Sequence, residues 1–377
     1  MKSNNKRVMV AGHVCLDITP VFQMNSISRL GDVLAPGKLI HVGNADIHTG
    51  GAVSNTGLAM KKLGANVSLV AKIGDDAFGH VVKEKLNEYD SGNDLVVKPA
   101  NSTSYSVVVA IPGIDRIFLH HPGANDSFIA DDITDKMLDG VRHFHFGYPP
   151  LMKKMYENNG VELISLFQRV KKHGITTSLD MAAVDPNSPA GNVDWEILMK
   201  GLMPYVDFFL PSVEELGFML NRTMYDDWNR RAEGGDVTRI LDIKRDIEPL
   251  ADRLLRLGTK VVLIKCGAPG MLYKTAGADE MDMILKKNAL SPEGWNNKSG
   301  FEESYLADKV VSGTGAGDTS IAAFLASMLR GYDLDKCVKL AAATGACCLS
   351  SYDALGGLKP LDELWERICN GWEKERF

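Results

Sequence analysis

Residues 310–324 read VVSGTGAGDTSIAAF, in which the end of an apolar strand runs into a glycine-rich turn and then into a helix. After the turn, apolar side chains recur at helical spacing, at Ile321, Phe324, Leu325, Met328 and Leu329. Unpaired N–H groups and the helix dipole favour negative charge at a helix start. Small residues at Gly315, Ala316 and Gly317 would therefore let phosphate oxygens approach the backbone closely.

Asp318 lies in the same turn, and two interpretations of it are open. Its carboxylate could take a proton from a substrate hydroxyl while that oxygen attacks phosphorus. Alternatively, it caps the helix and the glycines only turn the chain. Two better-known nucleotide motifs are disfavoured, because no lysine follows the glycines and Asp318 stands where a G-x-G-x-x-G motif has its last glycine.

Short β-branched runs alternate with helical patterns on both sides of this segment. A helix is expected at 52–63, and the later strands are each expected to lead into a helical stretch. The expected strands span residues 7–12, 67–73, 141–147, 175–180, 206–210 and 261–265. This alternation predicts an α/β fold with a mostly parallel central sheet and helices on both faces.

Two segments interrupt the alternation. Residues 18–48 show turn residues and no helical period, and residues 104–121 read SYSVVVAIPGIDRIFLHH, two strands around a turn. Together they predict a small β-sheet lid over a site on the main sheet. We expect a large domain from residues 1–17, 49–99 and 122–377, and a discontinuous lid from residues 18–48 and 100–121. Residues 275–308 lack a clear period and are expected to form a surface excursion.

The composition limits what the chain can do. Its 377 residues are 45% hydrophobic, and 42 basic against 48 acidic residues give a net charge of −6. This balance disfavours a nucleic-acid partner, and no stretch approaches the roughly 18 apolar residues of a membrane helix. We therefore expect a soluble cytoplasmic protein with neither a nucleic-acid nor a membrane partner.

Cysteine and histidine spacing argues against a metal or disulfide framework. The six cysteines lack paired C-x-x-C spacing, which predicts reduced core thiols. His143 and His145 would share one face of a strand, as metal ligands can, but no further ligand cluster lies nearby. Satisfied core or surface histidines are the favoured interpretation.

Two glycine motifs together resemble the signatures of the ribokinase-like (PfkB-type) carbohydrate kinases. Gly315–Asp318, opening a helix near the C-terminal end, is similar to the second signature, and HTGGAVSNTGLA at 48–59, continuing to IGDDAFG at 73–79, is similar to the first. The resemblance covers nearly the whole chain. It implies a ribokinase-like fold and the phosphorylation of a small sugar or related polyol with ATP and Mg²⁺.

The resemblance also implies roles for particular residues. Asp318 would be the catalytic base, and the N–H groups of Gly315, Ala316 and Gly317 would form the anion hole. Sugar contacts would come from Asp17, Gly50, Gly51, Asn55 and, from the lid side, Asn125. Simpler interpretations stay open: Asp17 caps a turn, the glycine pair serves as a helix entry, and Asn55 faces solvent.

Nucleotide and metal contacts follow from three other segments. Glu215 would help to order Mg²⁺, but Ser212 replaces the asparagine of the family's Asn-x-x-Glu motif, and Ser-x-x-Glu is also a capping box. Gly267 and Gly270, with Thr314, would lie on the nucleotide side, where a hairpin turn is the alternative for the glycine pair. Ser312 stands where many family members have an aspartate tied to a monovalent cation, which predicts weak or absent activation by K⁺.

Other functions remain to be weighed at this point. A nucleoside kinase and a non-catalytic sugar- or nucleotide-responsive binding protein could both have the same fold. Asp318 and its glycines argue against the binding protein, because such a protein needs no base there. A dinucleotide-dependent oxidoreductase would need a G-x-G-x-x-G motif after the first strand, and residues 11–15 do not provide one. The sequence leaves the sugar, sugar acid, nucleoside or phosphosugar substrate open. Homodimerisation through the lid is a further implication of the resemblance.

Overall fold

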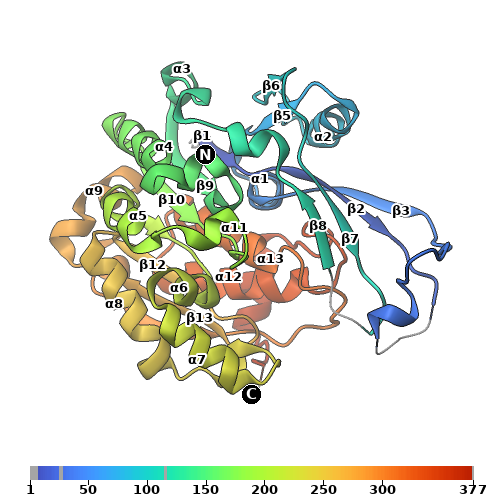
Figure 1. The fold of residues 1–377 in the computed structure, drawn as a ribbon. Coiled ribbons are helices and arrows are strands. Elements are labelled where there is room, and N and C mark those ends of the chain that lie inside the picture. The colour runs from blue at the N-terminus through green and yellow to red at the C-terminus, as the bar shows by residue number, and fades with distance from the viewer. Residues whose placement is uncertain (1–6, 25–28, 114–116, 376–377) are drawn as a thin grey trace.

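A computed structural model describes residues 7–24, 29–113 and 117–375, and its main feature is an eight-stranded sheet (Figure 1). The strand order is β14-β13-β12-β11-β10-β9-β1-β4. Neighbours from β12 to β4 pair in parallel, whereas β13 pairs antiparallel with both β12 and β14. The strands are β1 (Arg7–Gly12), β4 (Asn66–Val70), β9 (Val141–Gly147), β10 (Thr176–Asp180), β11 (Phe208–Phe209), β12 (Val261–Lys265), β13 (Gly270–Thr275) and β14 (Ser299–Glu303). The predicted mostly parallel sheet is confirmed.

Helices cover both faces of this sheet because successive strand residues point to opposite sides. Val8 and Val10 belong to one apolar cluster, while Met9 and Ala11 belong to the other. The first cluster includes residues of α1 (Ala52–Lys62), α2 (Ala77–Asn87), α9 (Ala278–Asn288), α10 (Pro292–Trp295), α11 (Ala316–Leu329), α12 (Leu334–Cys348) and α13 (Leu361–Cys369). The second includes residues of α3 (Asp135–Leu138), α4 (Lys153–Lys172), α5 (Trp195–Leu202), α6 (Val213–Leu220), α7 (Arg222–Ala232) and α8 (Glu248–Leu257).

A small second sheet extends to one side of the helical body (Figure 1). Its order is β3-β2-β7-β8, with antiparallel pairs at both ends and a parallel β2–β7 pair in the middle. The strands are β2 (Cys15–Pro20), β3 (Ala45–Gly50), β7 (Tyr105–Val109) and β8 (Ile117–His121). The predicted small β-sheet therefore forms from two separated parts of the chain.

One predicted strand is divided in the structure. Residues 67–73 were expected to be continuous, but β4 ends at Val70, and β5 (Lys72–Gly74) pairs with β6 (Val96–Lys98) in a separate sheet. Lys72 explains the break, because its buried ammonium group forms an ion pair with Asp132 at 2.7 Å. A lysine with a fixed partner outside the main sheet cannot continue a strand that is apolar on both faces.

Two further expectations about the C-terminal half are wrong. β12 leads into a hairpin with β13 and not into a helix, since Gly267 and Gly270 adopt positive φ angles of 61° and 137°. The segment 275–308 is not a mere surface excursion, because it contains α9 and the edge strand β14. Met281, Ile284 and Leu285 of α9 are buried in the core.

Polar residues inside the sheet are paired as structural groups. The ring nitrogens of His143 hydrogen-bond the hydroxyls of Thr176 (2.9 Å) and Ser178 (2.8 Å), and burial lowers the pKa of His143 and His145 to about 3. Within the described residues, no three His, Cys, Asp or Glu side chains could hold a metal ion together. His143 is therefore a satisfied core histidine, as predicted, and the six cysteines are free thiols.

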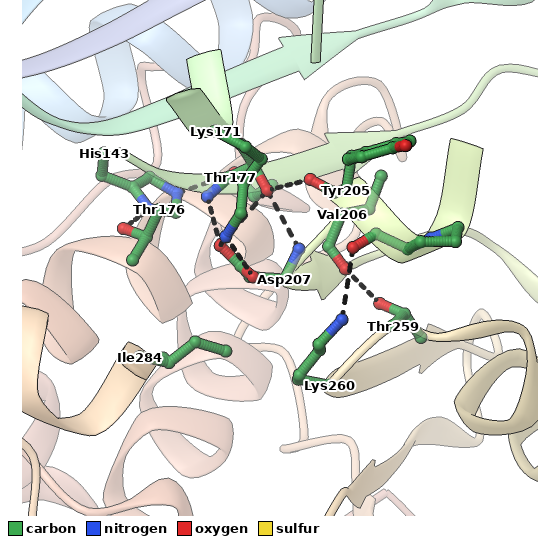
Figure 2. Close-up of polar contacts among 12 residues, drawn as sticks. His143, Lys171, Thr176, Thr177, Tyr205, Val206, Asp207, Thr259, Lys260 and Ile284 are labelled. Atoms are coloured by element: carbon green, nitrogen blue, oxygen red, sulfur yellow. Dashed lines mark hydrogen bonds and ion pairs between the residues drawn. The ribbon is translucent and has the colours of Figure 1, made fainter. Parts of the chain in front are cut away.

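A second polar network ties together the amino ends of β10, β11 and β12 (Figure 2). The buried carboxylate of Asp207 accepts hydrogen bonds from Lys171 Nζ at 2.8 and 2.7 Å and from the N–H of Thr177 at 2.9 Å. The Thr259 hydroxyl donates to the carbonyl of Val206 at 2.8 Å. These contacts fix the strands at the edge opposite to the glycine-rich turn. Across the described ranges, no helix has the length and apolar character needed to cross a bilayer.

Candidate active site

The glycine-rich turn leads into α11 as the sequence predicts. Gly315 adopts a positive φ of 76°, and a Cβ on it would lie 2.3 Å from the Cβ of Ala354. Ala316 and Gly317 form the first turn of α11, where backbone N–H groups have no intrahelical partner. The turn therefore presents N–H donors and almost no side chain, which suits an anionic oxygen.

Asp318 follows in the same turn and is nearly buried, with 4% of its surface exposed. Its carboxylate accepts hydrogen bonds from Tyr148 Oη (2.8 Å to each oxygen), Asn55 Nδ2 (3.0 Å to Oδ2) and Thr56 Oγ1 (3.2 Å to Oδ1). Burial raises the pKa of Tyr148 well above its usual value, so the phenol stays protonated as a donor. The carboxylate of Asp318, on α11, is thus held by donors from two other parts of the chain. Asn55 and Thr56 belong to α1, and Tyr148 follows β9.

A cavity of about 120 Å³, lined in part by Asn55, lies between the small sheet, the loop before α11 and the loop after α12. Its lining residues are Asp17, Thr19, Asp46, His48, Thr49, Asn55, Val108, Ala110, Phe118, Ser312, Thr314, Tyr352, Asp353 and Ala354. The predicted sugar residues Asp17 and Asn55 therefore face the same space. Thr314, predicted on the nucleotide side, lines this cavity instead.

A larger cavity of about 460 Å³ lies on the other side of the turn. It is lined by Arg239, Lys265, Gly267, Ala268, Gly270, Met271, Ser304, Tyr305, Ala307, Val310, Gly313, Ala316, Gly317, Ser320, Ala342, Gly345, Ala346, Leu349 and Glu375. Gly267 and Gly270 thus line the same space as Gly317 of the glycine-rich turn. The glycine pair is also the predicted hairpin turn, since the N–H of Cys266 donates to the carbonyl of Gly270 at 2.8 Å.

Lys265 and Asp180 are site residues that the sequence analysis missed. Lys265 Nζ lies 2.7 Å from Asp180 Oδ1, and both side chains are buried. Burial by itself lowers the pKa of Lys265, but Asp180, Glu215 and Asp318 together raise it above its usual value. Burial raises the pKa of Asp180 even though Lys265 lowers it. The sequence did contain a signal for this pair, since each of the two apolar strands ends in a charged residue. Parallel strands end at the same edge of the sheet, so the two side chains could have been expected to lie near one another.

Glu215 takes part in the capping box that the sequence allowed. Its Oε2 accepts the N–H of Ser212 at 2.7 Å, and its own N–H donates to Ser212 Oγ at 3.3 Å. The same carboxylate acts electrostatically on Asp180 and Lys265. Three carboxylates beside one lysine leave an excess of negative charge that suits Mg²⁺, which usually binds through one or two carboxylates, waters and substrate phosphates.

Asn125 and Gly50, which were predicted to contact the sugar, both make close contacts within the chain. Asn125 is fully buried, and its amide donates to the carbonyl of Val14 (2.9 Å) and accepts the N–H of Val14 (3.3 Å). Both ends of this amide are therefore used by the chain itself, and its sugar contact stays a prediction. A Cβ on Gly50 would lie 2.1 Å from Asp17 Oδ2, which shows how closely the backbone approaches that carboxylate.

Gly51 allows a matched test of backbone crowding at the site. Its φ is 86°, and a Cβ would lie 2.6 Å from both the ring Nδ1 and the carbonyl oxygen of His13. Gly234 has a nearly equal φ of 84° but no atom within 4 Å of such a Cβ. We expect Gly234→Ala to lose about 1–2 kcal/mol of unfolding free energy, and Gly51→Ala about 2–5 kcal/mol, measured by urea denaturation. Equal losses in the two variants would show that His13 does not crowd this position.

The chain is similar in sequence and fold to known kinases. An uncharacterised sugar kinase of Archaeoglobus fulgidus is 22% identical over 304 residues, 80% of this chain and 98% of that protein. Arabidopsis thaliana ribokinase is 24% identical over 323 residues, 85% of this chain and 72% of that protein. The solved structure of Arabidopsis thaliana ribokinase with ribose and ATP has the same fold, with a TM-score of 0.68, 20% identity and coverage of 96% and 98% of the two chains.

The family itself follows from the sequence profile that the chain matches. Residues 5–359 match the family described as "pfkB family carbohydrate kinase", a range that includes the glycine-rich turn and all the residues that line the two cavities except Glu375. This match extends over nearly all of the strands and helices that build the site. The chain is therefore a member of the PfkB family of carbohydrate kinases, which are ATP-dependent phosphotransferases.

Proposed function

We propose that the chain transfers the terminal phosphoryl group of ATP to a hydroxyl of a small sugar or related polyol, with Asp318 as the catalytic base. The neighbours of Asp318 connect it to both cavities, and this connection carries the proposal. Asn55, which lines the smaller cavity, donates to its carboxylate, and Gly317, which precedes it in the chain, lines the larger one. A base at this junction can reach an acceptor hydroxyl that faces a phosphoryl group.

The smaller cavity would hold the acceptor and the larger one the nucleotide. Asp17 and Asn55 offer a carboxylate and an amide to sugar hydroxyls. Asp318 takes the hydroxyl proton as the acceptor oxygen bonds to phosphorus and the bond to the ADP oxygen breaks. The N–H groups at the start of α11 stabilise the charge on the transferring group, because phosphoryl transfer depends mainly on positioning and electrostatics.

Asp180 and Glu215 are the residues that would hold Mg²⁺, through water molecules as well as through their carboxylates, because Mg²⁺ in proteins usually keeps several waters. Bound Mg²⁺ would neutralise charge on the nucleotide phosphates. Lys265 places a positive charge between these carboxylates and the glycine-rich turn. Its Nζ is paired with Asp180 and lies 3.7 Å from where a Cβ on Gly317 would be.

Acceptor-dependent release of ADP tests the proposal. The purified chain with ATP and Mg²⁺ is expected to release ADP slowly alone and much faster when a sugar or polyol acceptor is added. Phosphorus NMR should then show a new phosphate ester in an amount equal to the ADP formed. Release of ADP that is the same with and without every acceptor would contradict a sugar kinase.

Ser312 leads to a prediction about monovalent cations. Its hydroxyl donates to Thr314 Oγ1 at 3.0 Å and accepts the Thr314 N–H at 3.1 Å, and a neutral hydroxyl is a weaker cation ligand than a carboxylate. Replacing Na⁺ by K⁺ at constant ionic strength is expected to change turnover by less than about twofold. The Ser312→Asp variant supplies a carboxylate and is expected to respond more strongly. A large increase by K⁺ in the unmodified chain would overturn this expectation.

A further inference from the structure

The charge of the smaller cavity differs from that of the larger one. Among its described lining residues, the smaller cavity has three carboxylates, Asp17, Asp46 and Asp353, and neither lysine nor arginine. The larger cavity is lined by Lys265 and Arg239 together with a single acidic residue, Glu375. The larger cavity is therefore lined by two cationic side chains, of which Lys265 is paired with Asp180, whereas neither lysine nor arginine is among the described residues that line the smaller cavity.

Two of the three carboxylates are fixed by their own hydrogen bonds. Asp17 Oδ1 accepts the thiol proton of Cys15 at 3.2 Å, in the strand pair that forms the cavity floor. Asp353 Oδ1 accepts the N–H groups of Leu355 (2.7 Å) and Gly356 (2.6 Å). These carboxylates cannot turn away from an incoming anion without losing those bonds.

Burial affects the charge of two histidines near the cavity. Burial lowers the pKa of His13 to about 3, and it also lowers the pKa of His120, so both imidazoles are neutral at pH 7. His48 lines the cavity, but its Nε2 lies 2.6 Å from Asp46 Oδ1 and is taken by that carboxylate. Among the described residues that line the cavity, a bound phosphate or carboxylate would therefore meet carboxylates and neither lysine nor arginine.

A neutral molecule with many hydroxyl groups can form hydrogen bonds with this lining and is not repelled by it. Carboxylate oxygens accept hydrogen bonds from sugar hydroxyls, and the amide of Asn55 and the hydroxyls of Thr49 and Thr314 complete a neutral polar lining. The volume of about 120 Å³ is far below the roughly 300–1,000 Å³ of pockets that hold drug-sized ligands. Both properties favour a small and uncharged polyol.

We propose that the acceptor substrate is an uncharged sugar or polyol, and that the three carboxylates of the smaller cavity exclude sugar phosphates and sugar acids. The proposal rests on the proposed function, in that it takes the smaller cavity to be the acceptor site. The proposal removes sugar phosphates and sugar acids from the list of substrates that the sequence left open.

Matched pairs of acceptors test the charge preference. Fructose is compared with fructose 6-phosphate, ribose with ribose 5-phosphate, and glucitol with gluconate, each by ADP release with ATP and Mg²⁺. In any pair that is turned over, kcat/KM is expected to be at least about 100-fold higher for the neutral member. A pair in which the anionic member is the better substrate would overturn the proposal.

A charge-removing variant shows whether the cavity carboxylates cause the preference. In Asp46→Asn, the ratio of kcat/KM for the anionic member to that for the neutral member is expected to rise roughly tenfold. Asp282→Asn removes the same charge from an exposed ion pair with Lys286 on α9 and should leave that ratio unchanged. An equal ratio in Asp46→Asn, Asp282→Asn and the unmodified chain would refute the role of the cavity charge.

Binding measurements separate this proposal from the proposed function. Calorimetric titration of the unmodified chain with the same pairs, in the absence of ATP, reports charge preference without any turnover. Tighter binding of neutral members supports the inference even if no acceptor stimulates ADP release, in which case only the kinase function fails. Tighter binding of anionic members contradicts the inference even if a sugar is phosphorylated.

Discussion

Replacing Asp318 with asparagine is expected to lower kcat by roughly 10²–10⁴-fold, the usual contribution of a positioned general base. An amide cannot take up the hydroxyl proton, whereas the carboxylate of Asp318 is hydrogen-bonded to Tyr148 and to Asn55, which lines the smaller cavity. Turnover measured by ADP release at saturating ATP and acceptor checks this expectation.

The same variant should keep its fold and its binding properties. Asparagine has the shape of aspartate, and its amide oxygen can still accept a hydrogen bond from Tyr148 or Asn55. We therefore expect the melting temperature and the acceptor dissociation constant to remain close to those of the unmodified chain. A loss confined to kcat is the pattern of an interaction made in the transition state.

A matched control comes from another helix of the same face. Asp335→Asn also changes an aspartate to an amide, but Asp335 is exposed on α12 in an ion pair with Lys339. Its turnover should equal that of the unmodified chain. Near-normal turnover in Asp318→Asn would reject Asp318 as the base, whatever the substrate.

Replacing Lys265 with methionine is expected to cost about 3–5 kcal/mol of unfolding free energy at neutral pH. Methionine retains much of the apolar stem of lysine, so the loss reports the missing charge more than missing volume. Without Lys265, the buried carboxylate of Asp180 would face Glu215 and Asp318 with no cation beside it. Urea denaturation measures the loss.

The cost of Lys265→Met should depend on pH in a defined direction. Burial raises the pKa of Asp180 in the folded chain, and removing Lys265 removes the group that opposes this shift. The folded state then binds a proton that the unfolded state has released above about pH 3.9, so stability falls as pH rises through that range. The deficit should shrink by up to about 1.4 kcal/mol for each pH unit of acidification toward that value.

A double variant separates charge from packing. Lys265→Met combined with Asp180→Asn removes both charges of the pair and should recover most of the lost stability, since it leaves no uncompensated buried charge. A pH-independent loss that the second substitution does not recover would show that Lys265 stabilises the fold by packing alone. ATP affinity should stay weakened in both variants because Lys265 lines the larger cavity.

Local patterns predicted the elements that position the site. The apolar runs ending at Gly147 and Asp180 predicted β9 and β10, and the glycine turn before α11 predicted the helix start that presents Asp318. These signals are local, because strand alternation and helix starts are set by neighbouring residues. The motif resemblance added Asp17 and Asn55, which the structure brings to one cavity.

Contacts between distant segments could not be predicted in the same way. Lys265 and Asp180 end strands that are separated by β11, so their ion pair depends on sheet order and register. Tyr148 reaches Asp318 from a left-handed backbone conformation with φ of 67°, which a tyrosine rarely adopts. The expectation of a helix after β12 was wrong, and the hairpin turn left open for Gly267 and Gly270 is correct, because an apolar run does not reveal whether a helix or a strand follows it.

The parallel pair at the centre of the small sheet also bears on how the chain folds. Leu16–Ile18 pair with Tyr105–Val107, and the whole of α1 and α2 lies between these segments in the sequence. Closing such a long loop costs entropy before any pairing is gained, whereas contacts within a helix form locally. We expect the small sheet to assemble after the helical body, so a newly folded chain would possess its anion-binding turn before it has an enclosed place for the acceptor.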